Sequence, residues 1–298
     1  MKRKLLQKIL VCLILVNIYS CSIDKKVKSD AYGNFEATEV TVSSEANGRI
    51  ISFNAKEGDT LKKNQVVCEI DAVSSGLKKE ELFAQKNFTV AKLNTYNSQI
   101  EIIEAQKKIQ EKEFARFERM FRESAATQKQ LDDIAGQINV LEKQIENVKV
   151  QKTAAESELK LLDNKIRQIN DQIMKCSVIN PISGTIINKF MEQGELAVQG
   201  KALYKIADLE SMYLRVYVSE PQLSTIKIGQ SAEILIDGEK NQFLKMQGTV
   251  TYISDKAEFT PKIIQTRDER VKLVYAVKIS VKNNGAAKIG MPAEVNFK

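Results

Sequence analysis

The fold is decided by two stretches that repeat one another without a gap, VSSEANGRIISFNAKEGDTLKKNQVVCEIDA (Val42–Ala72) and VINPISGTIINKFMEQGELAVQGKALYKIAD (Val178–Asp208). The positions that recur at the constant offset of 136 residues are Val42 and Val178, Gly48 and Gly184, Ile50 and Ile186, Ile51 and Ile187, Gly58 and Gly194, and Ile70 and Ile206. Each copy reads as a turn, a β-rich strand, a second turn and a closing strand. One copy of about 30 residues cannot bury a core alone, so we expect the two copies to pair into one small β-sandwich.

The sequence between the two copies has a different character. Residues 77–175 contain no proline and only one glycine, Gly136, so little in them interrupts a helix. Apolar residues recur in steps of three and four along two arms, with polar interruptions at Lys107, Gln110 and Lys152, which is typical of a coiled coil. The first arm carries Leu93, Tyr96, Ile100, Ile103, Lys107, Gln110, Phe114, Phe117 and Phe121, and the second carries Leu131, Ile134, Ile138, Leu141, Ile145, Val148, Lys152, Ala155, Leu159, Leu162, Ile166, Ile169 and Ile173.

The break between the arms lies at residues 124–127, where Thr127 is expected to cap the second helix. Placing Phe121 against Leu131 and Leu93 against Leu159 keeps both arms in register about this turn. The segment is therefore predicted to be an antiparallel helical hairpin. Its arms, at about 45 residues and about 1.5 Å per residue, are about 70 Å long.

The N-terminus has the pattern of a secretory signal. Four basic residues within the first eight precede the apolar run Ile9–Val16, which is too short to span a bilayer. The segment Ile18–Cys21 resembles a bacterial lipobox, with Tyr19 as a departure because that position is usually small. The resemblance implies that Cys21 becomes the diacylated N-terminus and anchors the protein to a membrane. The alternative is ordinary signal cleavage after Ser20.

The composition argues against catalysis. The sequence contains no histidine, so the commonest general base and metal ligand are missing. The acid pairs Glu80–Glu81 and Asp132–Asp133 are adjacent, so on a helix their carboxylates point about 100° apart. No GxxxxGK[ST] phosphate loop occurs. We predict no catalytic residue, no metal site and no cofactor.

The charge and the cysteines add two further expectations. The net charge of +7 falls to +3 without residues 1–20, so nucleic acid is not an expected partner. Cys68 and Cys176 lack a CxxC spacing, so neither zinc nor thioredoxin chemistry is indicated. Two interpretations of these cysteines stay open: small apolar strand residues, which we favour, or a disulfide formed in an oxidising compartment.

A split sandwich interrupted by a long hairpin resembles the HlyD-type periplasmic adaptor family, also called membrane fusion proteins, whose sandwich is lipoyl-like. Residues 207–236, with Gly229–Gln230 in a turn, resemble the start of the family's adaptor β-barrel. Residues 248–281 and 290–297 resemble the branch that pairs with ABC transporters. The likeness covers residues 35–298. It implies an elongated α+β fold: a long antiparallel coiled-coil hairpin in a split lipoyl-like β-sandwich, followed by a small β-barrel.

This organisation divides the chain into six parts. They are a lipoprotein signal peptide (1–20), a tether (21–34), an N-terminal strand with the first lipoyl-like half (35–73), the coiled-coil hairpin (74–175), the second lipoyl-like half (176–209), and the adaptor β-barrel with the membrane-proximal region (210–298).

The hairpin tip carries a motif that indicates a partner. Many adaptors of this family show Arg, then an aliphatic residue four later, then Ser seven after that, and here Arg116, Met120 and Thr127 hold these positions. Arg116 and Met120 lie one turn apart on one helix face, and Thr127 lies just across the turn. The resemblance implies that this patch docks an outer-membrane channel. In the alternative, Arg116 is solvated, Met120 fills the seam and Thr127 only caps a helix.

The expected function is that of a non-enzymatic adaptor in a tripartite efflux or secretion system. The resemblance implies an inner-membrane ABC transporter and a TolC-type outer-membrane channel as partners, and a homo-oligomer, a hexamer in the family. The expected location is the Gram-negative envelope, facing the periplasm, with the lipid anchor in the inner membrane. Two alternatives are a structural coiled-coil envelope lipoprotein and a biotin or lipoate carrier, and the absence of an MKM-like turn argues against the carrier.

Overall fold

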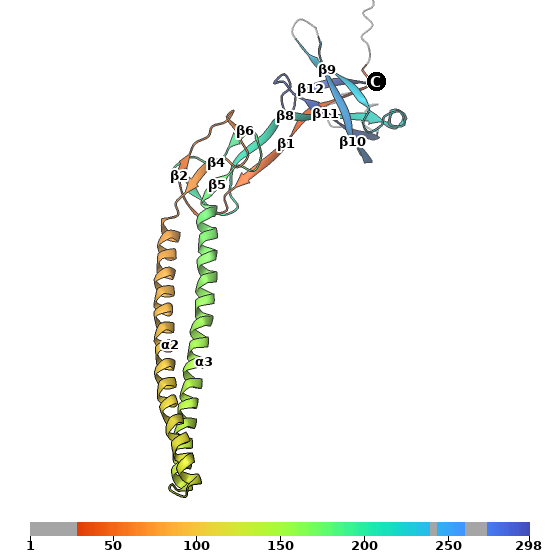
Figure 1. Ribbon diagram of the computed structural model, residues 1–298. Helices are drawn as coiled ribbons and strands as arrows, with labels where there is room; N and C mark the ends of the chain where they lie inside the picture. The colour runs from red at the N-terminus through yellow and green to blue at the C-terminus, as the bar shows by residue number, and fades with distance from the viewer. Residues whose placement is uncertain (1–28, 239–242, 260–272) are drawn as a thin grey trace, which may run out of the picture. The chain divides into compact units, whose positions relative to one another are not determined.

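The computed structural model describes residues 29–238, 243–259 and 273–298, which Figure 1 draws in colour. The lipidation residue predicted from the sequence, Cys21, lies outside the described residues. No helix among the residues described is long and apolar enough to cross a membrane.

The chain divides into two compact units. One unit comprises residues 39–207, and the other combines the residues before 39 with residues 208–298. Two long strands, β1 (Ala31–Ser43) and β8 (Ala202–Ser219), run through both units. The first strand therefore contributes to both units and not to the sandwich alone.

The unit of residues 39–207 contains the β-sandwich built from the two sequence copies. Its strands are β2 (Gly48–Phe53), β3 (Thr60–Leu61), β4 (Val66–Ile70), β5 (Ser177–Ile179), β6 (Gly184–Lys189) and β7 (Leu196–Ala197). One sheet has the order β5-β4-β2-β7, while β3 pairs with β6, which pairs with β8. Strands of one copy thus pair with strands of the other, as the repeat predicted.

The two copies bind each other reciprocally. The Ile50 N–H donates to the Glu195 carbonyl (2.9 Å), and at the same offset the Ile186 N–H donates to the Asp59 carbonyl (3.0 Å). The pairing of β2 with β7 is likewise matched by the pairing of β3 with β6. Because each copy supplies the backbone partners that the other lacks, neither half is complete alone.

The sandwich core explains the two cysteines. Ile50, Cys68 and Ile186 are at most 1% exposed and belong to one apolar cluster that also contains Cys176. Both thiols are free, so the disulfide alternative is wrong. In the strand register Cys68 faces Val178, and burial raises the pKa of the Cys68 thiol to about 11. The cysteines act as small apolar core residues.

The segment between the copies is a helical hairpin formed by α2 (Val73–Arg122) and α3 (Gln128–Lys175). Every predicted seam position except Phe121 is buried or half-buried, and most residues between them are exposed. The seam extends further toward the sandwich than Leu93, the first seam position predicted from the sequence. Leu82 and Thr89 are buried, and Lys86 between them is half-buried.

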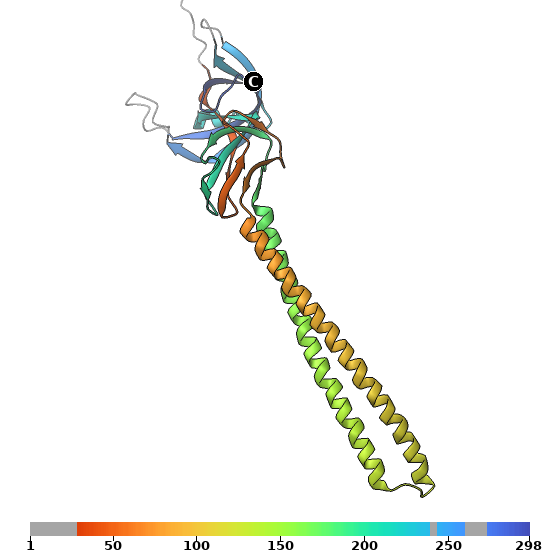
Figure 2. The same cartoon turned by 90° about the vertical axis from the view of Figure 1, so that its left-hand side faces the viewer.

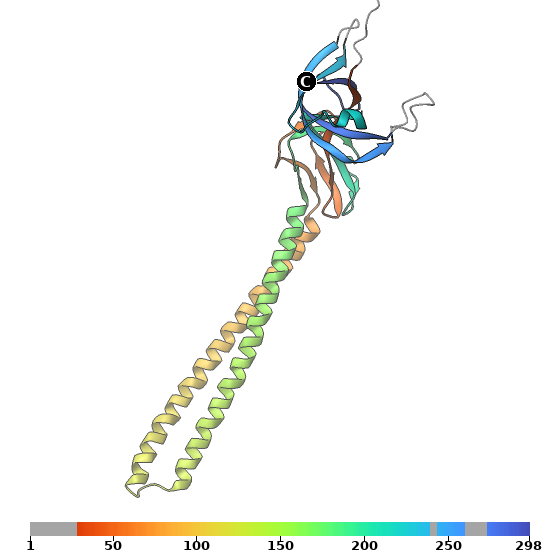
Figure 3. The ribbon, with the colours of Figure 1, turned by 90° about the vertical axis from the view of Figure 1, so that its right-hand side faces the viewer.

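The two arms wind around each other. Near the sandwich they lie apart in Figure 1, whereas near the tip they lie apart in Figures 2 and 3 and overlap in Figure 1. Such winding is expected when an apolar seam repeats every 3.5 residues on helices with about 3.6 residues per turn. The predicted antiparallel coiled coil is confirmed.

The second unit is a β-barrel. Besides β1 and β8 it contains α4 (Glu220–Leu223), β9 (Ser231–Asp237), β10 (Phe243–Phe259), β11 (Leu273–Lys282) and β12 (Pro292–Phe297). The strand order β1-β12-β9-β10-β11-β8 is closed by a pairing between β8 and β1. Leu214, Ile234 and Val295 fill its interior without exposure. The turn predicted at Gly229 has a φ of 87°, which glycine adopts without strain.

Candidate partner-binding site at the hairpin tip

The tip begins where α2 ends in a tight backbone turn. The Ala125 N–H donates to the Met120 carbonyl (2.7 Å) and the Ser124 N–H donates to the Phe121 carbonyl (2.9 Å). This is the Schellman arrangement, in which the residue after the helix adopts a left-handed conformation. That residue is Ser124, with a φ of 58°. The turn therefore holds the chain reversal with its own backbone bonds.

Thr127 caps the N-terminus of α3, as the sequence predicted. Its hydroxyl accepts from the Gln130 N–H (3.4 Å), while the Thr127 N–H donates to the Gln130 Oε1 (2.8 Å). The Thr127 hydroxyl also donates to the same side-chain oxygen (3.0 Å). This capping box satisfies two backbone donors at the helix start. Thr127 therefore has a structural role, and its hydroxyl proton is already used.

Arg116 lies in the last two turns of α2 with an exposed side chain. Its guanidinium pairs with Glu113 on the same helix and lies 5.6 Å from the centre of the Phe117 ring. Its side chain is 58% exposed, so the ion pair is screened by water and contributes little to stability. Arg116 is therefore held in place but open to a second partner.

The three predicted tip residues share one end of the hairpin. Met120 follows Arg116 by one turn and is half-buried, and its carbonyl accepts the bond from the turn that leads to Thr127. Among the described residues, no hydrogen bond or ion pair joins Arg116, Met120 and Thr127 to each other. The structure places them near one another along the chain reversal but does not link them.

The tip carries further charged residues that were not predicted from the sequence. Arg122 pairs with Glu118 (2.8 Å), and the Arg119 guanidinium donates to the Ala115 carbonyl (3.3 Å). With Arg116, these form a cluster of three arginines in the last two turns of α2. The spacing of three residues between successive arginines was a visible signal, because it places each arginine about 60° around the helix from the one before it.

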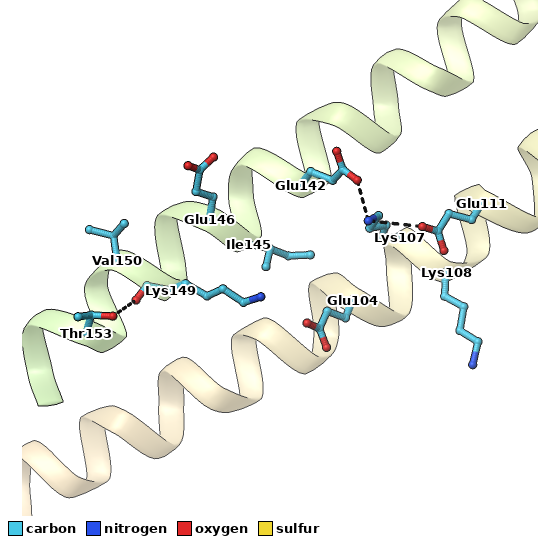
Figure 4. Close-up of a pocket in the computed structure, with 10 residues that line it drawn as sticks. All are labelled: Glu104, Lys107, Lys108, Glu111, Glu142, Ile145, Glu146, Lys149, Val150 and Thr153. Atoms are coloured by element: carbon cyan, nitrogen blue, oxygen red, sulfur yellow. Dashed lines mark hydrogen bonds and ion pairs between the residues drawn. The ribbon is translucent and has the colours of Figure 1, made fainter.

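The seam is polar in the middle of the hairpin. Figure 4 shows Lys107 of α2 between Glu111 on its own helix (3.4 Å) and Glu142 on α3 (2.7 Å). The hydrogen bond with Glu142 is the main reason that the pKa of Lys107 is raised. A cavity of about 920 Å³ lies here, lined by charged side chains of both arms and by Ile145, Val150 and Thr153. In the described part of the chain, no cluster of three or more metal-ligating side chains occurs.

The fold and sequence together match a known family. The family model for the RND MFP barrel-sandwich hybrid domain matches residues 38–209. The chain belongs to this membrane fusion protein family. The matched region contains the split sandwich and the entire hairpin, which are the parts that the internal repeat identified. Membrane fusion proteins are periplasmic adaptors, and this is the functional class of the chain.

Individual relatives share this organisation. The UPF0194 membrane protein YbhG of Salmonella gallinarum is 25% identical over 300 residues, covering 89% of this chain and 87% of the relative. The crystal structure of MacA from Actinobacillus actinomycetemcomitans superposes with a TM-score of 0.60 at 19% identity, covering 90% of this chain and 77% of MacA. The membrane fusion protein Spr0693 from Streptococcus pneumoniae gives a TM-score of 0.57 at 15% identity, covering 90% of this chain and 97% of that protein. The structural likenesses concern the fold alone.

Proposed function

We propose that this membrane fusion protein is the adaptor of a tripartite efflux or secretion system, joining an inner-membrane ABC transporter to a TolC-type outer-membrane channel. It assembles as a ring of copies, hexameric by family resemblance. Its location is the periplasmic side of a Gram-negative envelope, where a lipid on Cys21 anchors it to the inner membrane. The similarity of residues 248–281 and 290–297 to adaptors of ABC transporters supports the transporter class.

The observation that carries this proposal is the hairpin itself. Its arms of 50 and 48 residues leave the sandwich together and end in a turn whose side chains are mostly exposed. At about 1.5 Å per residue, the tip lies about 70 Å from the sandwich. A rigid arm of this length that ends in an exposed patch suits a protein that bridges two distant partners.

At the tip, the chemistry favours a partner with carbonyl or carboxylate acceptors. Arg116 has five donors, of which its bond to Glu113 uses only part, so it can give charge-assisted hydrogen bonds to an acceptor on the channel rim. Met120 supplies an adaptable apolar contact beside it. Thr127 keeps the reversal in place through its cap, so its contribution to docking is indirect.

A charge reversal at Arg116 tests this proposal. In Arg116→Glu, we expect crosslinking to the channel and export to fall sharply, while helicity and membrane fractionation are unchanged because both residues are good helix formers. Because every copy in the ring carries the substitution, each tip binds the channel more weakly, and the total loss of binding is multiplied.

The matched control is Arg122→Glu. Arg122 is also exposed and also pairs with a glutamate on its own helix, but it lies about 120° around α2 from Arg116. We expect this variant to keep most of the crosslinking and export. Equal export by the wild type and both variants would show that the Arg116 patch is not the docking site.

A further inference from the structure

An arginine on the barrel contacts carboxylates from two other strands. Arg215 of β8 donates from one Nη atom to both carboxylate oxygens of Glu258 on β10, at 2.8 and 2.9 Å. Its other Nη atom lies 3.9 Å from the carboxylate of Glu36 on β1, which is an ion pair but too long for a hydrogen bond. We call Glu36, Arg215 and Glu258 the Arg215 cluster.

The pairing with Glu258 leaves part of the guanidinium unused. The Nε–H of Arg215 is shut off from solvent and meets no acceptor among the described residues. A buried donor without an acceptor is costly, and a guanidinium binds a carboxylate best through two nitrogens at once. An arrangement in which Glu36 accepts from Nε and from an Nη atom would satisfy this donor. Two carboxylates therefore compete for one cation.

The neighbouring side chains keep both carboxylates close to Arg215. In the register of β8 with β11, Lys278 lies directly opposite Arg215. Like charges in opposite positions of a sheet repel, and the two glutamates balance the two cations. The guanidinium also lies 5.7 Å from the centre of the Tyr217 ring, a contact that does not depend on which carboxylate it binds.

The cluster lies where β1 and β8 touch. A Cβ added at Gly33 of β1 would overlap the carbonyl group of Arg215 and the Cα of Val216, so only glycine permits this approach of the two backbones. Glu36 follows Gly33 by three residues on β1, and both strands continue into the unit of residues 39–207. A displacement of β1 against β8 therefore changes the distance between Glu36 and Arg215.

A bulge in β10 comes just before Glu258. Residues 254–256 of β10 lie opposite the single residue Ala276 of β11. The Ser254 hydroxyl donates to the Lys256 carbonyl (2.9 Å) and accepts from the Lys256 N–H (3.2 Å), so the bulge closes on itself. A strand bends at a bulge, which gives the end of β10 a point about which it can move.

Beyond the bulge, the end of β10 has few partners. Its pairing with β9 stops at Thr249, and residues 257–259 pair only with β11. Figures 2 and 3 show the end of β10 and the start of β11, in blue, projecting from the barrel. The last cross-strand pair is Phe259 and Leu273, which are 75% and 54% exposed. Among the described side-chain bonds, the one between Glu258 and Arg215 ties this end to β8.

We propose that the Arg215 cluster is a two-state switch that couples the crossing of β1 and β8 to the end of β10. In the arrangement of this structure, Arg215 binds Glu258 and holds the end of β10 in place. In the other arrangement, Glu36 binds Arg215 through its Nε–H, and the end of β10 is released at the bulge. This inference goes beyond the proposed function, and its tests need neither a transporter nor a channel.

Two matched glutamine variants of the full-length protein test the competition, with hydrogen exchange of the amides of residues 257–259 and 273–275 as the measurement. Glu258→Gln should speed their exchange by about tenfold, because a charge-assisted hydrogen bond is lost. Glu36→Gln should slow it, because the competing arrangement is removed. A cluster that only adds stability would speed exchange in both variants. Equal or faster exchange in Glu36→Gln, or unchanged exchange in Glu258→Gln, would overturn the proposal.

The coupling to the strand crossing is tested by Gly33→Ala, whose Cβ forces β1 away from β8. The same amides should exchange faster in this variant, but Gly33→Ala should add nothing in the Glu258→Gln background, because the end of β10 is already released there. An additive increase would overturn the coupling. The amides of β9 report any general loosening of the barrel, and if they also speed up, the opposite effects of the two glutamine variants decide.

Discussion

The two helices of the hairpin are held together by different contacts next to the sandwich and in the middle of the hairpin. Near the sandwich, Leu82, Leu162, Ile166 and Ile169 form an apolar cluster in which each residue is 5–8% exposed. In the middle, the apolar seam is interrupted by polar residues such as Lys107, and a cavity of about 920 Å³ is lined by side chains of both arms.

The two regions therefore contribute differently: the apolar cluster stabilises the hairpin, and the polar seam residues fix the alignment of its two helices. Apolar seam residues stabilise by the area that they remove from water, at about 25 cal/mol per Å². A polar residue in a seam stabilises less but is satisfied only in one arrangement, which favours one alignment of the helices. Lys107 reaches Glu142 across the arms and Glu111 along its own arm. The hairpin is therefore held firmly near the sandwich and aligned by charge in the middle.

The largest expected effect comes from placing a charge in the apolar cluster. In Ile169→Asp, the carboxylate enters a group formed by Leu82, Ile166 and Ile173, without a cation among them. We expect a loss of about 3–5 kcal/mol in the free energy of unfolding, because an unpaired charge is buried. Urea unfolding followed by helix circular dichroism measures it.

The matched substitution in the middle is Ile145→Asp. Ile145 is also 8% exposed, but it lines the cavity beside Lys107, which can pair with the new carboxylate. Its cost is therefore limited to lost apolar packing, roughly 2 kcal/mol. Equal losses from both substitutions would show that the two regions do not differ in the way described.

An intermediate effect is expected at the tip, where neither an apolar cluster nor a cross-arm ion pair is present among the described contacts. Thr127→Ala removes the hydroxyl of the capping box and should cost about 1 kcal/mol. Faster hydrogen exchange of the first amides of α3 would report it, with Thr127→Ser as the control that keeps the cap. Unchanged exchange in Thr127→Ala would show that the Schellman turn alone holds the tip.

The smallest effect is expected for Glu142→Gln, because the Glu142 carboxylate is half exposed and water screens its ion pair with Lys107. Because the pKa of Lys107 is raised, the loss of stability in Glu142→Gln is expected to depend on pH. The ion pair stabilises below the ordinary lysine pKa and loses this contribution as pH rises through the raised pKa of Lys107. The stability difference between wild type and Glu142→Gln should therefore be present at pH 8 and decline as the pH rises above the ordinary lysine pKa. A difference that persists at the higher pH would contradict a role for the Lys107 charge.

Much of the fold was predictable because its signals are periodic. The offset of 136 residues revealed the two halves of the sandwich, and the steps of three and four revealed the seam of the hairpin. The seam at Leu82 and Thr89 was missed because Lys86 between them looks like a surface residue. In the structure, Lys86 reaches Asp163 on the other arm, so its stem lies in the seam while its charge is paired.

The tip was predictable in outline but not in its contacts. The resemblance implied a docking patch at Arg116, Met120 and Thr127, which stays a prediction, whereas the cap indicated by the residue type at Thr127 is confirmed. The pairing of Arg116 with Glu113 was not predicted, because several glutamates lie within reach of each arginine on a helix surface and spacing alone does not choose among them.

The sequence by itself determined the order of parts, the hairpin with its seam and the position of its turn. These follow from local periodicity, which each segment carries within itself. Only the tertiary structure decided three other features: the reciprocal bonds between the sandwich halves, the free state of Cys68 and Cys176, and the ion pairs that join the two arms. These depend on which distant groups meet. That is settled by the simultaneous packing of residues that lie far apart in the sequence, and no local pattern encodes it.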